Sequence, residues 1–230
     1  MPRPHPGRTA VFHIIPIEKL GSVIEHGLLC DALAQVRFGS QPATDAAHAD
    51  LKAARRAKGV TVARGGVMSD YVPFYFGPRS PMLFSIKCGY TNYGRNGRGQ
   101  PGMIHLVCHM ERLAQGFADA WGFIDAHLTR DWALFGDTLP EPDQRIDFDV
   151  MTARMWDSPD ELRAARQAEF LVHGVVPWEY VELIVVMRDD VAAEVDVVIT
   201  DFGAQHRPQV HVRPPGHYPE STFPHGYYYG

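Results

Sequence analysis

The sequence lacks several features that would assign it to a class of protein at once. Its 230 residues contain no run of eighteen apolar residues, so no membrane-spanning helix and no membrane partner are expected. Residues 1–8 have no apolar segment of the kind that a secretory signal needs. The three cysteines, Cys30, Cys88 and Cys108, are few, odd in number and far apart. This pattern favours free thiols in a reducing compartment, so we expect a cytoplasmic protein.

Motifs for nucleotide phosphates and for metals are also missing. The glycine-rich stretch at residues 90–102 fits neither the G-x-G-x-x-G fingerprint nor a P-loop. His105 and His109 flank Cys108, but a second Cys/His pair at zinc-finger spacing and a Glu between the histidines are absent. We therefore expect neither a metal site nor one of the nucleotide-binding folds that these motifs define.

The composition is that of an ordinary globular protein, but its charges are distributed unevenly. Hydrophobic residues make up 45% of the chain and charged residues 21%, which is enough for a substantial core. The net charge is −5, yet residues 1–110 hold 13 Lys and Arg against 6 Asp and Glu, and residues 111–230 hold 9 against 21. The balance is thus +7 in the first part and −12 in the second. This asymmetry allows a basic face for a polyanion, although chance unevenness explains it equally well.

Hydrophobic periodicity predicts a mixture of strands and short helices. Residues 9–15 have the pattern of a buried strand that ends at Pro16, and residues 17–28 that of a helix with Gly27 near its end. We expect further strands at residues 83–88, 103–108, 169–173, 181–187 and 209–213, and helices at residues 46–58, 149–166 (divided at Ser158 and Pro159, as N-cap and N1) and 189–198.

The remaining segments lack clear periodicity, and we interpret them as loops: residues 31–50, 90–102 and 117–148. In residues 70–82, Pro73, Pro78 and Pro81 argue against a central place in a regular sheet. Strands separated by loops favour an α+β fold over a doubly wound sheet. We expect one domain spanning residues 1–230, with residues 1–8 and 214–230 as tails.

Three groups of residues could carry chemistry. Glu169 heads an apolar strand, where the ordinary interpretation is a solvated carboxylate and the alternative is a catalytic one held on a rigid element. The helix at residues 46–58 holds a dense basic cluster, which is either a solvated face or a phosphate contact. The aromatic residues of the segment 70–82, together with Arg79, suit stacking on a nicotinamide or a nucleobase.

Taken together, these segments resemble the DarT family of DNA ADP-ribosyltransferase toxins over residues 9–213. Four pieces carry the resemblance: Phe12 and His13 with Gly27 and Leu28; residues 51–56; residues 65–82; and residues 168–172. The resemblance implies an α+β fold with a split β-sheet and NAD in a central cleft. It also implies transfer of ADP-ribose from NAD to a base of single-stranded DNA, and a macrodomain antitoxin of the DarG type as partner.

The resemblance also assigns roles to individual residues. It implies that Glu169 and Arg55 are catalytic. A guanidinium does not readily lose a proton, so Arg55 is better suited to clamping the NAD diphosphate or the incoming nucleotide than to proton transfer. The spacing to Gly65 selects Arg55 as the family arginine and leaves Arg56 as the alternative. Residues 31–54 would cover NAD, and residues 112–165 would read the DNA. NAD contacts are expected from Phe12, His13, Leu20, Gly27, Leu28, Arg55 and Tyr75, and DNA contacts from Arg79, Met82 and Arg56.

The acceptor is left open by the residues themselves. The segment 70–82 is close to that of thymidine-modifying members, which favours thymine, with guanine as the alternative. The same fold could also modify RNA or protein. A further alternative is a non-catalytic nucleic-acid-binding module, although a phosphate binder gains nothing from a carboxylate such as Glu169 in its cleft.

Overall fold

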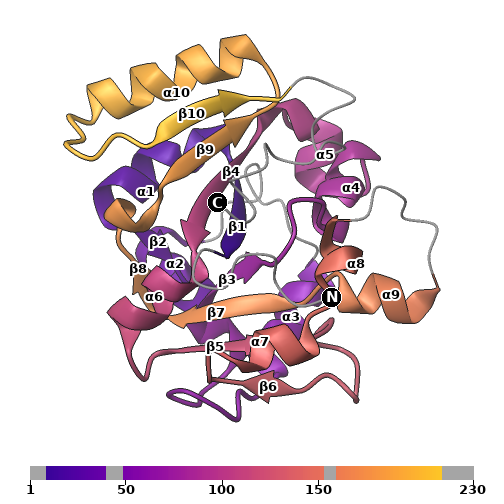
Figure 1. The fold of residues 1–230 in the computed structure, drawn as a ribbon. Helices are drawn as coiled ribbons and strands as arrows, with labels where there is room; N and C mark the ends of the chain where they lie inside the picture. Colours follow the sequence, from indigo (N-terminus) through magenta and orange to yellow (C-terminus); the bar gives the residue numbers. More distant parts are fainter. Residues whose placement is uncertain (1–8, 40–48, 153–158, 214–230) are drawn as a thin grey trace.

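The computed structural model describes residues 9–39, 49–152 and 159–213, and its main element is an eight-stranded sheet (Figure 1). The predicted tails, residues 1–8 and 214–230, lie outside the described residues. From edge to edge the strands follow the order β10-β9-β4-β1-β3-β7-β5-β6, and β9 and β10 form the parallel pair in an otherwise antiparallel sheet. The strands are β1 (Ala10–Pro16), β3 (Tyr71–Tyr75), β4 (Met103–His109), β5 (Trp121–Ile124), β6 (Phe135–Gly136), β7 (Glu169–His173), β9 (Leu183–Val186) and β10 (Gln209–Val212).

Helices cover the sheet and extend beyond its edges. Figure 1 shows α10 running along β9 and β10 at one end of the sheet, while α7 lies beside β6 at the other. A small second sheet joins β2 (Leu28–Leu29) to β8 (Val175–Val176). The α-helices are α1 (Leu20–His26), α2 (Asp31–Phe38), α3 (Ala49–Ala57), α4 (Pro81–Lys87), α5 (Asn92–Asn96), α6 (Met110–Phe117), α7 (Glu141–Arg145), α8 (Phe148–Thr152), α9 (Asp160–Ala165) and α10 (Asp189–Asp201). Short 3-10 helices include η1 (Ile17–Lys19) and η3 (Met68–Asp70).

The sheet is divided into two halves at the junction of β1 and β3, which we call the seam. β1 pairs with β4 along its whole length, from Ala10 to Pro16. With β3, in contrast, β1 pairs at one position, Phe12 opposite Tyr75. On the other side of the seam, β3 and β7 again pair continuously. The predicted split sheet is therefore present, and the backbone gap lies between two central strands.

Strand β1 shows why its sequence reads as one continuous apolar run. Val11 and Ile15 pack into one buried cluster, whereas Phe12 and Ile14 pack into another. Successive side chains of a strand point to opposite faces of the sheet, so both faces of β1 are covered. A strand buried on both faces needs apolar residues at nearly every position.

The strands expected at residues 9–15, 103–108, 169–173, 181–187 and 209–213 are all present, the last as the edge strand β10. The expected helices at residues 46–58 and 189–198 correspond to α3 and α10. Two helices, α8 and α9, occupy the expected divided segment, although Pro159 stands at the N-cap of α9 rather than at N1. Ser158, the expected cap, lies outside the described residues.

Several other predictions were wrong, mainly where short elements depend on local capping. Residues 83–88 belong to the helix α4, because the Ser80 hydroxyl accepts a hydrogen bond from the Leu83 amide at 3.2 Å and Pro81 opens the helix. The expected loops contain regular elements: α2 within residues 31–50, α5 within 90–102, and β5, β6 and α7 within 117–148. These elements are too short to produce a clear hydrophobic period.

Pro73 is also placed differently from the prediction, since it lies in β3 at the centre of the sheet. Its carbonyl faces β1, where it accepts a hydrogen bond from His13 Nδ1 at 2.6 Å. The N–H and C=O of one strand residue point to the same side. The missing proline N–H therefore faces the seam, where β1 does not pair with it, and no ladder hydrogen bond is lost.

Candidate active site

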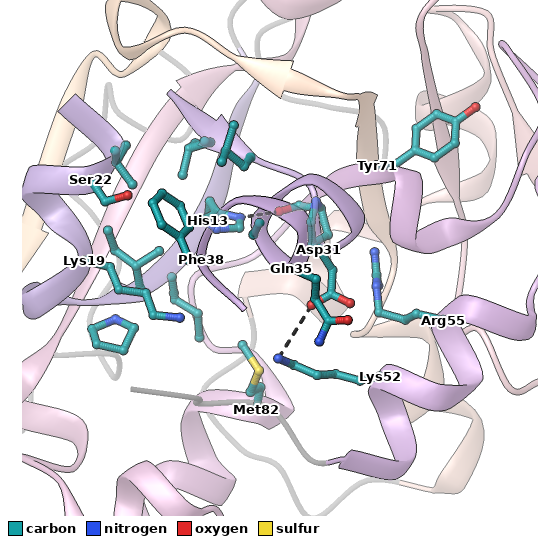
Figure 2. A pocket seen from close by; sticks show the side chains of 18 of the residues that line it. His13, Lys19, Ser22, Asp31, Gln35, Phe38, Lys52, Arg55, Tyr71 and Met82 are labelled. Atoms are coloured by element: carbon teal, nitrogen blue, oxygen red, sulfur yellow. Dashed lines mark hydrogen bonds and ion pairs between the residues drawn. The ribbon is translucent and has the colours of Figure 1, made fainter. Parts of the chain in front are cut away.

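A pocket of about 630 Å³ opens beside the seam and takes residues from both halves of the sheet. His13 of β1, Tyr75 of β3 and Glu169 of β7 line it together, although they are far apart in the sequence. Residues of α1, α2 and α3 supply further walls, and Met82 of α4 also lines it (Figure 2). Small-molecule sites typically span roughly 300–1,000 Å³, so a nucleotide-sized ligand is within reach.

Glu169 is the first residue of β7 and is fixed from both sides. Its backbone is in register with Tyr75 of β3 and with Ile124 of β5. The residue is only 7% exposed, which excludes a solvated strand edge. Arg55 Nη1 donates to Glu169 Oε2 at 2.6 Å, and the two side chains are 11% and 10% exposed. The pocket thus contains a largely buried ion pair with a charge-assisted hydrogen bond.

The two adjacent arginines of α3 have different partners. Arg55 reaches Glu169 and also donates from Nη2 to the Met68 carbonyl at 3.4 Å. Arg56 instead donates to Asp31 Oδ2 at 2.9 Å, and its side chain is 44% exposed. Both arginines line the pocket, but only Arg55 is bonded to the carboxylate. This geometry favours Arg55 over Arg56 as the functional arginine.

His13 enters the pocket from β1 as a neutral imidazole. Burial lowers its pKa from 6.5 to about 4, with smaller contributions from the charges of Arg55 and Lys19, while the Pro73 carbonyl opposes the shift. A carbonyl can only accept, so His13 Nδ1 carries the proton of that hydrogen bond. In the neutral ring Nε2 then has a free lone pair, which can accept a hydrogen bond from a hydroxyl or amide of a ligand.

Tyr75 of β3 lies next to Glu169, and both are across the seam from His13. Burial raises the pKa of its phenol well above the ordinary value, and the charge of Glu169 raises it further, whereas Arg55 lowers it. The hydroxyl is therefore protonated at any physiological pH. A neutral phenol with an aromatic face suits contact with a flat ligand ring beside the ion pair.

The pocket also contains residues that the sequence did not single out one by one, although Asp31, Gln35 and Phe38 belong to the segment 31–54 that the resemblance expected to cover NAD. Asp31 of α2 forms an ion pair with Lys52 of α3 at 3.6 Å, so it links the two helices across the pocket (Figure 2). Asp31, Gln35 and Phe38 all line the pocket. Their spacing of i, i+4 and i+7 places them on one face of a helix. This spacing would have predicted their common position if residues 31–38 had been interpreted as a helix. Lys19 and Ser22 line the pocket as well, and no sequence pattern marks them.

Most of the residues predicted for the site lie in this pocket, but three do not line it. Phe12 and Leu20 are core residues with exposed fractions of 1% and 0%. Arg79 is 4% exposed, so its side chain lies within the protein. The binding roles of these three residues stay predictions. Those that do line the pocket are His13, Gly27, Leu28, Arg55, Arg56, Tyr75, Met82 and Glu169.

Gly27 shows why one pocket position requires glycine. Its φ is +77°, a conformation that other residues rarely adopt, and an added Cβ would stand 2.7 Å from the Val176 carbonyl oxygen. The residue connects α1 to β2 at the pocket wall. Its small size therefore lets β2 and β8 approach closely behind the pocket.

In the described part of the chain no group of three or more His, Cys, Asp or Glu could hold a metal ion. His105, considered in the sequence for such a role, is buried and donates from Nε2 to the Pro78 carbonyl at 3.0 Å. Among residues 9–39, 49–152 and 159–213, no helix is long and apolar enough to cross a membrane.

A split sheet with a buried glutamate–arginine pair in a nucleotide-sized pocket is a candidate active site for a nucleotide substrate, and comparisons with known proteins identify the class of enzyme. The family described as "ssDNA thymidine ADP-ribosyltransferase, DarT" matches residues 12–219. A DNA ADP-ribosyl transferase of Thermus sp. (strain 2.9) is 36% identical over 219 residues, covering 95% of this chain and 100% of the relative.

Solved structures show the same likeness. Thermus sp. 2.9 DarT in complex with ADP-ribosylated ssDNA has a TM-score of 0.81 at 34% identity, covering 93% of this chain and 98% of that one. The same protein in complex with NAD+ has a TM-score of 0.72 at 33% identity, covering 91% and 97%. The chain therefore belongs to the DarT family and is an ADP-ribosyltransferase that acts on DNA.

Proposed function

We propose that this chain transfers the ADP-ribose unit of NAD to a thymine base in single-stranded DNA and releases nicotinamide. The observation that carries the proposal is the buried Glu169–Arg55 pair, 2.6 Å apart, in a pocket of about 630 Å³. Family membership supports the substrates, because the family description names thymidine in single-stranded DNA, and the solved relatives include complexes with NAD+ and with ADP-ribosylated DNA.

The residues around the pocket fit NAD as a substrate. Arg55, and Lys19 near His13, supply positive charge for a diphosphate. The free lone pair of His13 can accept a hydrogen bond from a ribose hydroxyl. Tyr75 presents a neutral ring for the nicotinamide, and Gly27 allows the close approach of the wall behind it. The pocket therefore offers matching groups to the diphosphate, a ribose and the nicotinamide of NAD.

Glu169 has two tasks in the transfer. The reaction breaks the bond between ribose C1′ and the nicotinamide nitrogen, which keeps the electron pair, and joins C1′ to a thymine ring nitrogen, which loses its proton. Positive charge develops on the sugar, as it does in glycoside cleavage, and a carboxylate beside the ribose stabilises it. Glu169 can then accept the proton of the base nitrogen. Arg55 orients the carboxylate and stays protonated throughout.

Single-stranded DNA is the natural acceptor for such a site. The reactive thymine nitrogen lies on the Watson–Crick edge, which is blocked in a duplex unless the base is flipped out. Arg56 and Met82 line the same pocket and are proposed to contact the incoming nucleotide. Arg79 is proposed to act in DNA binding too, although its buried position limits it to supporting contacts.

Several wider features belong to the same proposal. Residues 1–230 act as one catalytic domain, because both halves of the sheet contribute to one pocket. The family implies a toxin that is held in check by a macrodomain antitoxin of the DarG type, which removes the ADP-ribose. The three cysteines are free, which fits action in the cytoplasm.

The test is mass spectrometry of a mixed-sequence single-stranded oligonucleotide incubated with the protein and NAD. We expect a mass gain of one ADP-ribose unit, located on thymine by fragmentation and absent with the Glu169→Gln variant. A gain on guanine would correct the acceptor base. No gain on any DNA, with label appearing on RNA or protein instead, would overturn the proposal.

A further inference from the structure

One long stretch of this acidic protein contains no acidic residue. Between Asp70 and Glu111 the sequence holds forty residues without Asp or Glu, while the other 190 residues hold all 27. The same stretch contains four basic residues. It forms β3, α4, α5 and β4, and the two strands are buried in the sheet. The surface that remains is that of α4 and α5, which pack on each other beside the sheet (Figure 1).

The exposed side chains of α4, α5 and the turn between them include aromatic and basic residues. Phe84 and Tyr90 are 44% and 63% exposed, among the most exposed large hydrophobic residues that the structure describes. Lys87 is exposed on the same face of α4 as Phe84, three residues along the helix. Arg95 of α5 is exposed and forms no ion pair within residues 9–39, 49–152 and 159–213. We call Phe84, Lys87, Tyr90 and Arg95 the α4–α5 face.

This face is attached firmly to the pocket at two points. Met82, the second residue of α4, lines the pocket, so the helix leads from the pocket to the surface (Figure 2). The hydroxyl of the buried Tyr93 of α5 donates a hydrogen bond to Glu18 Oε2 at 3.0 Å, and Glu18 is also a pocket residue. Arg98, the remaining exposed cation of the stretch, is paired with Glu194 of α10 at 2.8 Å. The α4–α5 face therefore has a fixed position relative to the reacting nucleotide.

We propose that the α4–α5 face binds the part of the single-stranded DNA substrate that flanks the modified nucleotide. Bases stack on the rings of Phe84 and Tyr90, and phosphates are neutralised by Lys87 and Arg95. Aromatic rings interleaved with cations are the usual means of binding single strands without reading their sequence. The absence of carboxylates removes the repulsion that a polyanion would meet on the rest of this protein. The proposal rests on the proposed function, because DNA is the ligand that it places.

The first experiment measures binding of a labelled 20-nucleotide single strand, without NAD, at several salt concentrations. We expect Phe84→Leu and Tyr90→Leu to weaken binding about fivefold each, the lower end of what one stacked base contributes. The matched controls Phe84→Tyr and Tyr90→Phe keep the ring and should bind like the wild type. Unchanged binding in both leucine variants would overturn the stacking contacts.

Charge is tested by the double variant Lys87→Gln, Arg95→Gln. Each lost phosphate contact makes the slope of log affinity against log salt less negative by about 0.7 for single strands, so a change of about 1.4 is expected. Arg207→Gln, an exposed arginine between α10 and β10, is the control and should leave the slope unchanged. A wild-type slope in the double variant would exclude Lys87 and Arg95 as contacts.

The second experiment uses Cys88, which is exposed while Cys30 and Cys108 are buried, as a reporter beside Lys87. We expect the 20-nucleotide strand to slow alkylation of Cys88 by N-ethylmaleimide, and thymidine monophosphate, which has no flanking nucleotide, not to slow it. Protection without any ADP-ribosylation would leave this proposal standing and refute the proposed function. Modification of the strand without protection would do the reverse.

Discussion

The two halves of the main sheet differ in what their strands do. In the half formed by β10, β9, β4 and β1, the strands pair continuously and β4 is buried at every position but its last. The half formed by β3, β7, β5 and β6 also pairs continuously, but it supplies the carboxylate Glu169 to the pocket, whereas the first half supplies the neutral His13 of β1. Hydrogen-bonded strands lie only about 4.8 Å apart, which leaves no room for a ligand. The pocket opens beside the junction where this pairing nearly stops.

The sharpest way to test this difference is to change one carboxylate in each half. Glu169→Gln should lower the rate of DNA modification at least about a hundredfold, as loss of one charge-stabilising group typically does. Glu182→Gln, which removes a half-buried carboxylate paired with His109 and Arg112 before β9, should leave the rate unchanged. Rates would be measured by mass spectrometry of the oligonucleotide, with thermal unfolding to verify the fold. Equal rates for Glu169→Gln and the wild type would remove the glutamate from the mechanism.

Arg55 and Arg56, adjacent in α3, provide the second test, because they have different partners. Arg55→Ala leaves the buried Glu169 without its partner. Removing one member of a buried ion pair lowers the free energy of unfolding by about 3 kcal/mol or more. We expect a rate loss of roughly a hundredfold. Arg55→Lys should not restore the rate, because a lysine lacks the planar fork.

Arg56→Ala removes a partly exposed bond to Asp31, worth about 1 kcal/mol or less, so a change of only a few-fold in the KM for DNA is expected. Steady-state kinetics of both variants would show the split. A larger loss in Arg56→Ala than in Arg55→Ala would reverse the assignment of the two arginines.

His13 lies at the seam and His105 lies in the buried strand β4. Variants of these two histidines distinguish an effect on stability from an effect on activity. Burial lowers the pKa of both His13 and His105 from 6.5 to about 4. The folded protein thus binds fewer protons than the unfolded chain between these pH values. The two neutral histidines contribute fully to the free energy of unfolding above pH 6.5, and this contribution is lost as the pH falls toward 4. For the fully buried His105 the loss is about 3 kcal/mol.

His105→Gln should therefore flatten the dependence of unfolding free energy on pH between 4 and 6.5, while leaving activity at pH 7 unchanged. His13→Gln should flatten it too, but should also raise the KM for NAD, because it removes the acceptor in the pocket. Chemical denaturation across this pH range provides the measurement. A normal KM for NAD in His13→Gln would place His13 outside the binding contacts.

Two glycines that flank the small sheet separate the cost of backbone conformation from the cost of a steric clash. Gly27→Ala should destabilise by about 1–3 kcal/mol, because φ is +77° and the new Cβ would meet the Val176 carbonyl at 2.7 Å. Gly174 has a similar φ of +80° but open space around it. Gly174→Ala should therefore lower the free energy of unfolding by only about 1 kcal/mol, from the unfavourable backbone conformation alone. Equal losses in the two variants would show that the close approach behind the pocket contributes nothing.

Much of the fold could be predicted from the sequence, and the failures share a cause. The strands β1, β4 and β9 are buried on both faces, so their sequences are continuous apolar runs that stand out. Helix α4 was mistaken for a strand, although Ser80 followed by Pro81 signals a helix start. The helices α2 and α5 are short and exposed, with no apolar face strong enough to mark them.

The candidate site was predicted residue by residue, but not as an arrangement. Glu169, Arg55, Tyr75 and His13 were selected through the family resemblance, and all four line the pocket. Nothing in the sequence indicated that Arg55 would bond to a carboxylate 114 residues away. The pocket residues of α2 were expected only as part of the segment 31–54 that would cover NAD, because residues 31–50 were interpreted as a loop and not as a helix with one face toward the pocket.

The sequence by itself determined most of the strands, the longer helices and the inventory of charges. It placed apolar runs where strands lie, a carboxylate at the head of β7, and a forty-residue stretch without acids. Only the tertiary structure decided that Glu169 is buried, that Arg55 rather than Arg56 meets it, and that Pro73 faces a gap in the sheet. The physical reason is that local patterns depend on neighbours along the chain. Burial and charge pairing depend on distances in space, which long-range strand pairing sets.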